Sequence, residues 1–336
     1  MRVERVTSYE RFVETKKDWN KLLSRSGQNC PFLTHQWFDA WWQNFGPNDE
    51  LGILFFWDDS ASLGGISPLM VSGAALRFMA SHEVTDYCDF ISCEDYRVKF
   101  YEHLLDHFQM NSSKYYPMEL INIPESSPTL SILPGLAAGR GWEYESHENE
   151  IAPVLKLSES YEEFLQNLGR KNRHELRRKT RKWESLGNVR IEKVTEPEKL
   201  SLAIKKFVSL HKESSPAKQE FWQKKGMPEF FSQLVHHFAI ENWAELHMLY
   251  VEDRLIAALL CFPYEDIVYF YNIAYDRGYS PLSPGFFLFD QAIKQSIAQG
   301  KKVADFLRGR EKYKYFFGAK ESKIYSLKLK HKEDNP

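Results

Sequence analysis

The segment Tyr269–Gly318 constrains the fold most, because a strand, a helix start, a helix and a second strand follow one another in it. Apolar alternation through Ile267–Tyr275 predicts the first strand. Pro284 and Gly285 then open the helix, and Val303–Leu307 predicts the second strand. Backbone N–H groups exposed at a helix start bind phosphate readily. The segment therefore predicts an α/β fold with an anion site at the start of its helix.

The chain has 336 residues, which is more than one domain usually holds, so we expect two domains. A hydrophobic content of 43% with 15% aromatic residues excludes an intrinsically disordered protein. The formal net charge of -2 gives no overall attraction to nucleic acid, so any polyanion binding would come from local clusters.

The cysteine pattern and the apolar runs predict where the protein works. The four cysteines lack CxxC spacing, which argues against a disulfide framework or a zinc site, and we predict no metal. The N-terminus lacks the apolar core of a signal peptide, and the apolar runs are too short to cross a membrane. We expect a cytoplasmic protein and leave peripheral docking on the inner membrane open.

The two halves of the chain predict the same order of elements. The C-terminal half reads as a strand, two helices, three consecutive strands, a helix and a strand, at 189–194, 197–213, 221–240, 245–251, 255–262, 267–275, 284–299 and 303–307. The N-terminal half repeats this plan at 2–6, 9–26, 34–45, 51–57, 66–71, 76–80, 94–109 and 118–123. Ser158–Leu186 predicts one long basic helix between them.

This plan resembles the GNAT acyltransferase fold written twice. Four motifs carry the resemblance: PFLTHQWFDAWWQNFG, RKNRHELRRKTRKWESLG, SPGFFLFDQAIKQSIAQG and DFLRGREKYKYFFG. They are similar to the CelD/BcsL-type acetyltransferases of bacterial polysaccharide loci, which are related to the Fem peptidyltransferases. The resemblance implies an α/β (α+β) fold of two tandem GNAT-like domains, each a mixed, mostly antiparallel sheet flanked by helices. We expect domains at 1–155 and 188–332, joined by a basic helix at 156–187.

The resemblance also implies an acyl-CoA donor whose pyrophosphate lies at the start of the helix after the fourth strand of the C-terminal domain. Gly285 would allow close backbone approach, and Ser283 would cap the helix. Phe286 and Tyr275 complete the predicted donor site. The chain departs from the usual Gln/Arg-x-x-Gly-x-Gly/Ala loop, and Pro284 has no N–H to donate. The alternative is that this turn is only a good helix start.

Acyl transfer to an amine or hydroxyl needs a proton acceptor and stabilisation of the developing oxyanion. Fem-type enzymes carry a Phe-Lys pair at the place of Tyr313-Lys314, so Lys314 is the candidate that stabilises this charge. The alternative is an exposed lysine on an amphipathic turn. Asp305 is a candidate base, and Arg308 is a candidate ligand for an acidic acceptor by bidentate contact. An internal Asp305–Arg308 pair that fixes a turn remains the alternative.

Acceptor-binding candidates come from both halves. In the resembling family, an Asp-Tyr pair faces the acceptor cleft, which makes Asp86 a candidate base and Tyr87 a candidate contact. A turn aspartate is the alternative. Alternation predicts that Tyr271 and Tyr275 share one face of the fourth strand, where core packing is the alternative to binding. Arg177 belongs to a stripe of arginines that would bind an anion or remain a solvated face.

We therefore expect an acyltransferase that moves an acetyl or other acyl group from acyl-CoA to a sugar, nucleotide-sugar or glycan acceptor. The N-terminal copy is expected to have lost donor binding and to shape the acceptor site. An acyl carrier protein or an anionic membrane surface is an open partner for the basic helix. Two alternatives remain: aminoacyl transfer from tRNA, as in Fem enzymes, and a non-catalytic binding module of GNAT origin.

Overall fold

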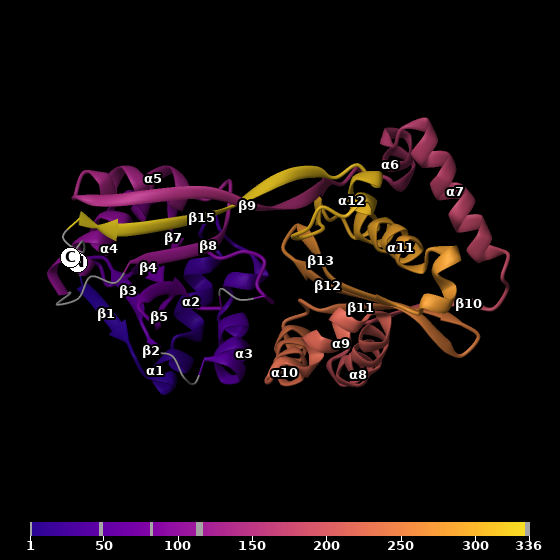
Figure 1. Cartoon of the computed structure of the whole chain (residues 1–336), viewed down its shortest axis with the longest axis horizontal. Coiled ribbons are helices and arrows are strands. Elements are labelled where there is room, and N and C mark those ends of the chain that lie inside the picture. The colour runs from indigo at the N-terminus through magenta and orange to yellow at the C-terminus, as the bar shows by residue number, and fades with distance from the viewer. Residues whose placement is uncertain (1, 47–49, 81–82, 112–116, 333–336) are drawn as a thin grey trace. The chain divides into compact units, whose positions relative to one another are not determined.

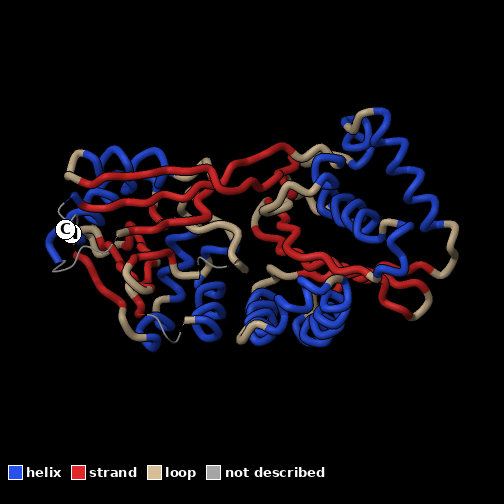
Figure 2. The backbone as a smooth tube through the Cα atoms, in the orientation of Figure 1, coloured by secondary structure: helices blue, strands red, loops and turns tan. Residues whose placement is uncertain are grey.

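A computed structural model describes residues 2–46, 50–80, 83–111 and 117–332 (Figure 1). The chain divides into two compact units. Unit 1 comprises Met1–Glu150 together with Lys323–Pro336, and unit 2 comprises Ile151–Ser322. Two long strands, β9 (Trp142–Lys156) and β15 (Lys320–His331), have residues in both units and are drawn as continuous strands in Figure 2.

Unit 1 has two sheets with helices packed on them. Its elements are β1 (Arg2–Val6), α1 (Tyr9–Glu14), α2 (Lys16–Leu23), η1 (Pro31–Leu33), α3 (His35–Phe45), β2 (Glu50–Leu51), β3 (Ile53–Trp57), β4 (Leu63–Ser67), β5 (Leu69–Ser72), β6 (Ala75–Phe78), β7 (Ile91–Ser92), η2 (Glu94–Tyr96), α4 (Arg97–Asn111), β8 (Met118–Pro124) and α5 (Pro128–Ala138). The first sheet has the order β1-β3-β4-β7, and the second contains β2, β5, β6, β8, β15 and β9.

The strand predicted over 66–71 is two strands in two different sheets. β4 ends at Ser67 and β5 begins at Leu69, with Pro68 between them. Proline has no N–H to donate to a ladder, so the pairing changes partner at this residue. The carbonyl of Pro68 instead accepts a hydrogen bond from the backbone N–H of Met79 at 2.8 Å. The single strand expected here is therefore wrong.

Unit 2 follows the predicted order closely. Its elements are α6 (Tyr161–Asn167), α7 (Arg170–Glu184), β10 (Val189–Val194), α8 (Pro197–Ser214), α9 (Pro216–Gln223), α10 (Met227–Ile240), β11 (Glu245–Val251), β12 (Arg254–Tyr264), β13 (Ile267–Tyr275), η3 (Arg277–Leu282), α11 (Pro284–Ala298), β14 (Val303–Asp305) and α12 (Lys312–Phe316). The strands β10 to β13 are antiparallel neighbours, and β14 joins β13 in parallel. Helices α8, α9 and α10 cover one face of this sheet and α11 covers the other (Figure 1).

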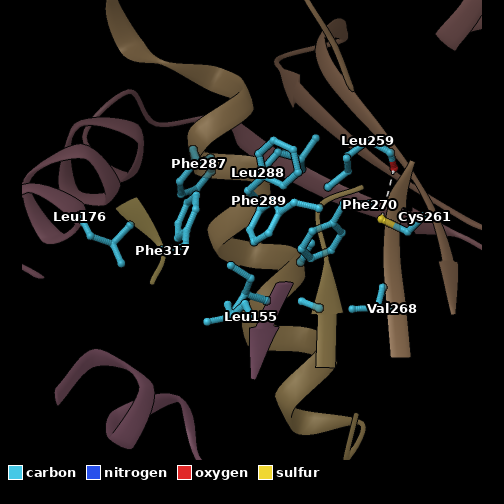
Figure 3. Close-up of a cluster of buried hydrophobic side chains, with 14 of the residues drawn as sticks. Leu155, Leu176, Leu259, Cys261, Val268, Phe270, Phe287, Leu288, Phe289 and Phe317 are labelled. Carbon is cyan, nitrogen blue, oxygen red and sulfur yellow. Dashed lines mark hydrogen bonds between the residues drawn. The ribbon is translucent and has the colours of Figure 1, made fainter. Parts of the chain in front are cut away.

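The core of unit 2 lies between the sheet and α11. Phe270 of β13 packs against Phe289 of α11, with ring centroids 5.4 Å apart (Figure 3). The ring centroid of Phe306 lies 5.2 Å from that of Phe270. Leu155 at the end of β9 and Phe317 belong to the same buried cluster. Aromatic pairs at such separations contribute packing energy beyond the area that they bury. The core therefore fixes α11 against β13, the two elements that carry the predicted donor site.

The basic segment after β9 forms two helices in place of the single helix expected over Ser158–Leu186. Leu168 and Gly169 have extended backbone between α6 and α7, and Leu168 is buried at 4% exposure. Leu176 and Trp183 of α7 also join the buried cluster of unit 2. Burial of these apolar side chains anchors both helices to the unit.

The predicted fold class, a mixed sheet arrangement flanked by helices, is confirmed by both units. No helix among the described residues is long and apolar enough to cross a membrane.

Candidate active site

The strands β13 and β14 separate part-way along their length. They pair only from Ile267–Tyr269 to Val303–Asp305, whereas β13 continues beside β12 as far as Tyr275. The end of β13 therefore has an edge that β14 does not cover. Backbone groups on such an edge are available to a ligand or to side chains.

Two side chains reach carbonyls on this edge of β13. Lys218 Nζ donates to the carbonyl of Ile273 at 2.8 Å, and Ser214 Oγ donates to that of Tyr275 at 3.3 Å. In an antiparallel strand the N–H and C=O of one residue point to the same side. The N–H groups of Ile273 and Tyr275 therefore face this edge as well. We refer to Phe270–Tyr275 on this side as the open edge.

A bulge in β13 lies next to the open edge and changes which side chains share a face. The register with β12 shifts so that Leu260 pairs with Asn272, whereas Cys261 pairs with Phe270. Tyr271 is the extra residue, and its ring lies 5.8 Å from Phe231 of α10. Bulges often lie beside active sites, where they redirect side chains.

Tyr275 packs on the opposite face, against the core cluster that includes α11. The expectation that Tyr271 and Tyr275 share one face is therefore wrong, because the extra residue reverses the alternation between them.

The start of α11 lies against the open edge. A methyl group added to Gly285 would lie 3.5 Å from Ile273 Cγ1 and 3.7 Å from Tyr275 Cδ1, which is ordinary contact distance. Because the first N–H groups of a helix have no intrahelical acceptor, those of Gly285 and Phe286 are available at this place. The helix dipole adds partial positive charge there. The open edge and the helix start thus form one continuous region.

Ser283 does not cap α11 as predicted. Its backbone is left-handed, with φ of 54°, and its side chain makes no capping hydrogen bond. Its hydroxyl instead accepts a hydrogen bond from Lys179 Nζ of α7 at 2.7 Å. Lys179 also lies 5.0 Å from the ring centre of Phe286, and burial lowers the pKa of its amine. Ser283, Phe286 and Lys179 therefore lie together at the helix start.

Sequence reasoning missed Lys179 and Lys218, which stand out only once the chain is folded. Lys179 was one of many basic residues in α7, and Lys218 stood in the unremarkable segment PAKQEFWQ. Lys218 is half-buried, and burial together with the nearby charge of Arg277 lowers the pKa of its amine to about 8. A fraction of this amine is therefore neutral near pH 7, when an exposed lysine is almost fully protonated.

Lys314 is buried, at 2% exposure, so the alternative of an exposed turn lysine is wrong. Its Nζ donates to the carbonyls of Leu307, Arg308 and Gly309 at 2.9, 2.7 and 3.1 Å. It also lies 2.9 Å from Glu311 Oε2. The three N–H donors of the ammonium are thus directed at the loop that follows β14.

Asp305 ends β14 and is buried at 6% exposure. Its Oδ1 accepts a hydrogen bond from the backbone N–H of Leu307 at 2.8 Å. Leu307 has φ of 59°, a left-handed conformation that is costly for a leucine. Asp305 and Lys314 together hold this loop, which carries the half-buried Arg308, in a strained shape.

The remaining candidates lie apart from the open edge in the chain. Asp86 and Tyr87 belong to unit 1, where each is 9% exposed and Tyr87 packs 5.6 Å from Phe32. Arg177 is exposed on α7, while Arg173 of the same stripe turns inward and donates to the carbonyl of Leu165 at 3.3 Å. The arginine stripe is therefore divided between protein and solvent contacts.

One buried group in unit 2 has the residue types of a metal site. Ligand atoms of Glu245, His247 and Cys261 lie within 4.8 Å of one another. Glu245 already accepts hydrogen bonds from Lys193 and from His247, each at 2.8 Å. The lysine ammonium and the imidazole of His247 satisfy the carboxylate, and these contacts explain why Glu245 is tolerated in the core.

Residues 170–315 match the family model described as an acetyltransferase (GNAT) domain. This similarity covers less than half of the chain. It begins at α7 and ends within α12, so it includes the open edge, the start of α11, Lys179 and Lys218. The sequence matches no curated protein.

Solved structures extend the similarity to the whole chain. FemX superposes with a TM-score of 0.64 at 10% identity, over 97% of this chain and 97% of that chain. The C-terminal domain of a putative lysylphosphatidylglycerol synthetase from Agrobacterium fabrum gives a TM-score of 0.60 at 10% identity, over 96% and 93%. A protein of unknown function from Bacteroides thetaiotaomicron gives a TM-score of 0.60 at 9% identity, over 98% of this chain and 99% of that chain. These likenesses show a shared fold, and the CelD/BcsL-type resemblance stays a prediction.

Proposed function

We propose that unit 2 binds an acyl-CoA thioester along the open edge and transfers its acyl group to an amine or hydroxyl of a sugar or cell-envelope precursor. The observation that carries this proposal is the separation of β13 from β14 beside the start of α11, within the segment that matches the GNAT domain. An extended donor with amide groups would pair with the free edge as a strand does.

The residues at the helix start fit the anionic end of this donor. The first N–H groups of α11 and the ammonium of Lys179 offer hydrogen-bond donors and positive charge close together. Phe286 and Tyr275 add apolar surface at the same place, and Gly285 leaves space between α11 and β13. Arg177 would contribute longer-range attraction from the exposed side of α7.

Lys218 is the group we propose as proton acceptor. Its amine donates a hydrogen bond to the carbonyl of Ile273, on the open edge where the thioester would be held. In the reaction, the acceptor's nitrogen or oxygen forms a bond to the acyl carbon, the carbon–sulfur bond breaks, and CoA leaves as a thiolate that takes a proton from water. A neutral amine at this place can take the proton that the acceptor loses.

Lys314 and Asp305 then take positioning roles, because their contacts hold the loop after β14 in place. Arg308 on this loop and Tyr271 beside the bulge remain proposed acceptor contacts in unit 2.

Asp86 and Tyr87 remain predicted acceptor contacts in unit 1. Substituting Asp86→Asn tests that part directly, since loss of an acceptor contact raises KM for the acceptor and leaves acyl-CoA binding unchanged.

The test of the proposed function is a thiol-release assay with acetyl-CoA and longer acyl-CoAs against a panel of amino sugars, nucleotide sugars and glycans. We expect acceptor-dependent release of CoA thiol and a product mass increased by the acyl group. Thiol release that never depends on an acceptor would contradict the proposal. Protection of α7 by aminoacyl-tRNA, without any acyl-CoA binding, would instead select the Fem-like alternative.

A further inference from the structure

A cavity of about 580 Å³ lies in unit 2 and shares no lining residue with the proposed donor site, although Phe317 of its lining packs on Phe286 with ring centroids 4.7 Å apart. It is lined by residues within 154–168, 302–303 and 317–322, which are the end of β9, α6 with its flanking loops, the start of β14 and the turn into β15. The residues of the proposed donor site lie on β13, α11, α7 and α9. The volume is within the range of small-molecule sites, so this cavity is large enough to hold a ligand of its own.

The floor of the cavity is apolar. Leu155, Phe164, Leu168 and Phe317 line it and are at most 6% exposed, because they also belong to the buried core of the unit. Figure 3 shows Leu155 and Phe317 in that core. Core side chains are held rigidly by close packing, so the floor keeps its shape without a ligand. An aliphatic chain could therefore pack on this preformed apolar surface.

The wall of the cavity carries excess positive charge. Lys156, Lys302 and Lys320 all line it. Within the part of the chain that the structure describes, none of these three ammonium groups forms an ion pair or hydrogen bond. The wall also contains Glu321, whose carboxylate accepts a hydrogen bond from Tyr315 at 2.9 Å. Cations gathered at a concave, low-dielectric surface attract an anion and raise its local concentration.

We propose that this cavity binds an amphipathic carboxylate, with its alkyl chain on the apolar floor and its acid group at Lys156, Lys302 and Lys320. The three unpaired lysines select an anionic head, and the buried floor selects an apolar tail. A small anion such as acetate would leave the floor uncovered, and a neutral alcohol would gain no charge attraction from the three exposed lysines. This binding does not depend on the proposed acyl transfer.

The test is isothermal titration calorimetry on the full chain with octanoate, decanoate and decyl phosphate below their micelle concentrations and with decanol below its solubility limit. We expect one decanoate per chain, and an affinity that rises by up to about fourfold for each methylene added from octanoate. Decanol should bind at least about tenfold more weakly than decanoate. Absence of saturable decanoate binding overturns the proposal. Binding of decyl phosphate without decanoate overturns the assignment of a carboxylate head.

Variants place the binding in the cavity. Replacing Lys156, Lys302 and Lys320 together by Gln should weaken decanoate at least about tenfold and remove its salt dependence. The matched control replaces three exposed lysines outside the cavity, Lys206, Lys212 and Lys225, by Gln, and should leave the affinity unchanged.

A second variant, Ser158→Trp, fills the cavity from its loop and should also abolish binding, while circular dichroism checks that the fold is kept. Decanoate affinity equal to wild type in both cavity variants would overturn the proposal.

Discussion

At the scale of single residues, Lys218 makes the sharpest chemical prediction. Burial and the charge of Arg277 lower the pKa of its amine to about 8. Competitive labelling with acetic anhydride across pH should therefore give Lys218 a midpoint near 8, below the ordinary lysine value of about 10.4. Arg277→Gln should raise the midpoint of Lys218, because it removes a neighbouring positive charge. A midpoint of Lys218 at the ordinary lysine value would contradict its proposed role as proton acceptor.

Lys314 makes a stability prediction. Lys314→Met leaves three loop carbonyls without their donor and a strained turn without its support. We expect a loss of about 3–5 kcal/mol in the free energy of unfolding, measured by urea denaturation. The control is Lys312→Met, an exposed neighbour on the same helix, which should change stability by less than about 0.5 kcal/mol. Similar losses for both variants would contradict the buried role of Lys314.

The sequence indicated where chemistry gathers, but it did not indicate each residue's contacts. It singled out Asp305 and Gly285 from their places after a strand and at a helix start, and Lys314 from the resemblance to Fem-type enzymes. It could not show that Lys314 turns inward or that Ser283 binds Lys179, because both depend on partners distant in the chain. No motif surrounds Lys218 in the sequence. It became a candidate only because its Nζ donates to a carbonyl on the open edge.

At the scale of elements, α7 is fixed to the start of α11 by Trp183. The indole Nε1 donates to the carbonyl of Leu282 at 3.0 Å, and the ring stacks on Phe287 at 5.4 Å. Trp183→Ala should cost about 3–5 kcal/mol of unfolding free energy and weaken acyl-CoA binding, because Lys179 loses its position. Leu186→Ala, at an exposed position beyond the same helix, is the control and should do neither. If Trp183→Ala bound acyl-CoA with unchanged affinity, the claim that α7 contributes to the donor site would be contradicted.

Elements with strong periodicity were predicted, and interruptions were not. The strands β11, β12 and β13 and the helix α11 follow from apolar patterns and local turn residues. The change of sheet at Pro68, the bulge at Tyr271 and the extended Leu168 depend on which neighbour each backbone group finds. Tertiary contacts determine these pairings, so they cannot be predicted from a single sequence.

At the scale of the whole molecule, the strands β9 and β15 were the main omission. Their sequences, WEYESHENEIAPVLK and KESKIYSLKLKH, are rich in charged residues, and no strand was predicted in either. The repeat of two similar halves was nevertheless visible, because it depends on the order of elements and not on residue identity. The order could be predicted, while pairing between strands distant in sequence could not.

Stability at low pH tests the buried group around Glu245. Burial alone would raise the pKa of this carboxyl, but hydrogen bonds and charge from His247 and Lys193 outweigh it and lower the pKa to about 2. A carboxyl with a depressed folded pKa stabilises the protein above its unfolded pKa near 4.5 and loses this contribution as pH falls toward 2. The contribution is about 3 kcal/mol.

The unfolding free energy of wild type minus that of Glu245→Gln should therefore shrink as pH falls from 5 to 2.5, measured by urea denaturation. A difference that is independent of pH over this range would contradict the depressed pKa. The control is Glu198→Gln at an exposed position on α8. Its unfolding free energy should differ little from that of wild type at every pH from 5 to 2.5.

The central claim is that acyl-CoA binds between the open edge and the start of α11, and calorimetric titration of acetyl-CoA tests it most directly. Wild type should bind one acetyl-CoA per chain. Gly285→Leu, which fills the space between α11 and β13, should weaken this binding at least about tenfold. Gly135→Leu places the same side chain at an open helical position in unit 1 and should bind as wild type does. No binding by wild type, or equal binding by wild type and Gly285→Leu, would contradict the account.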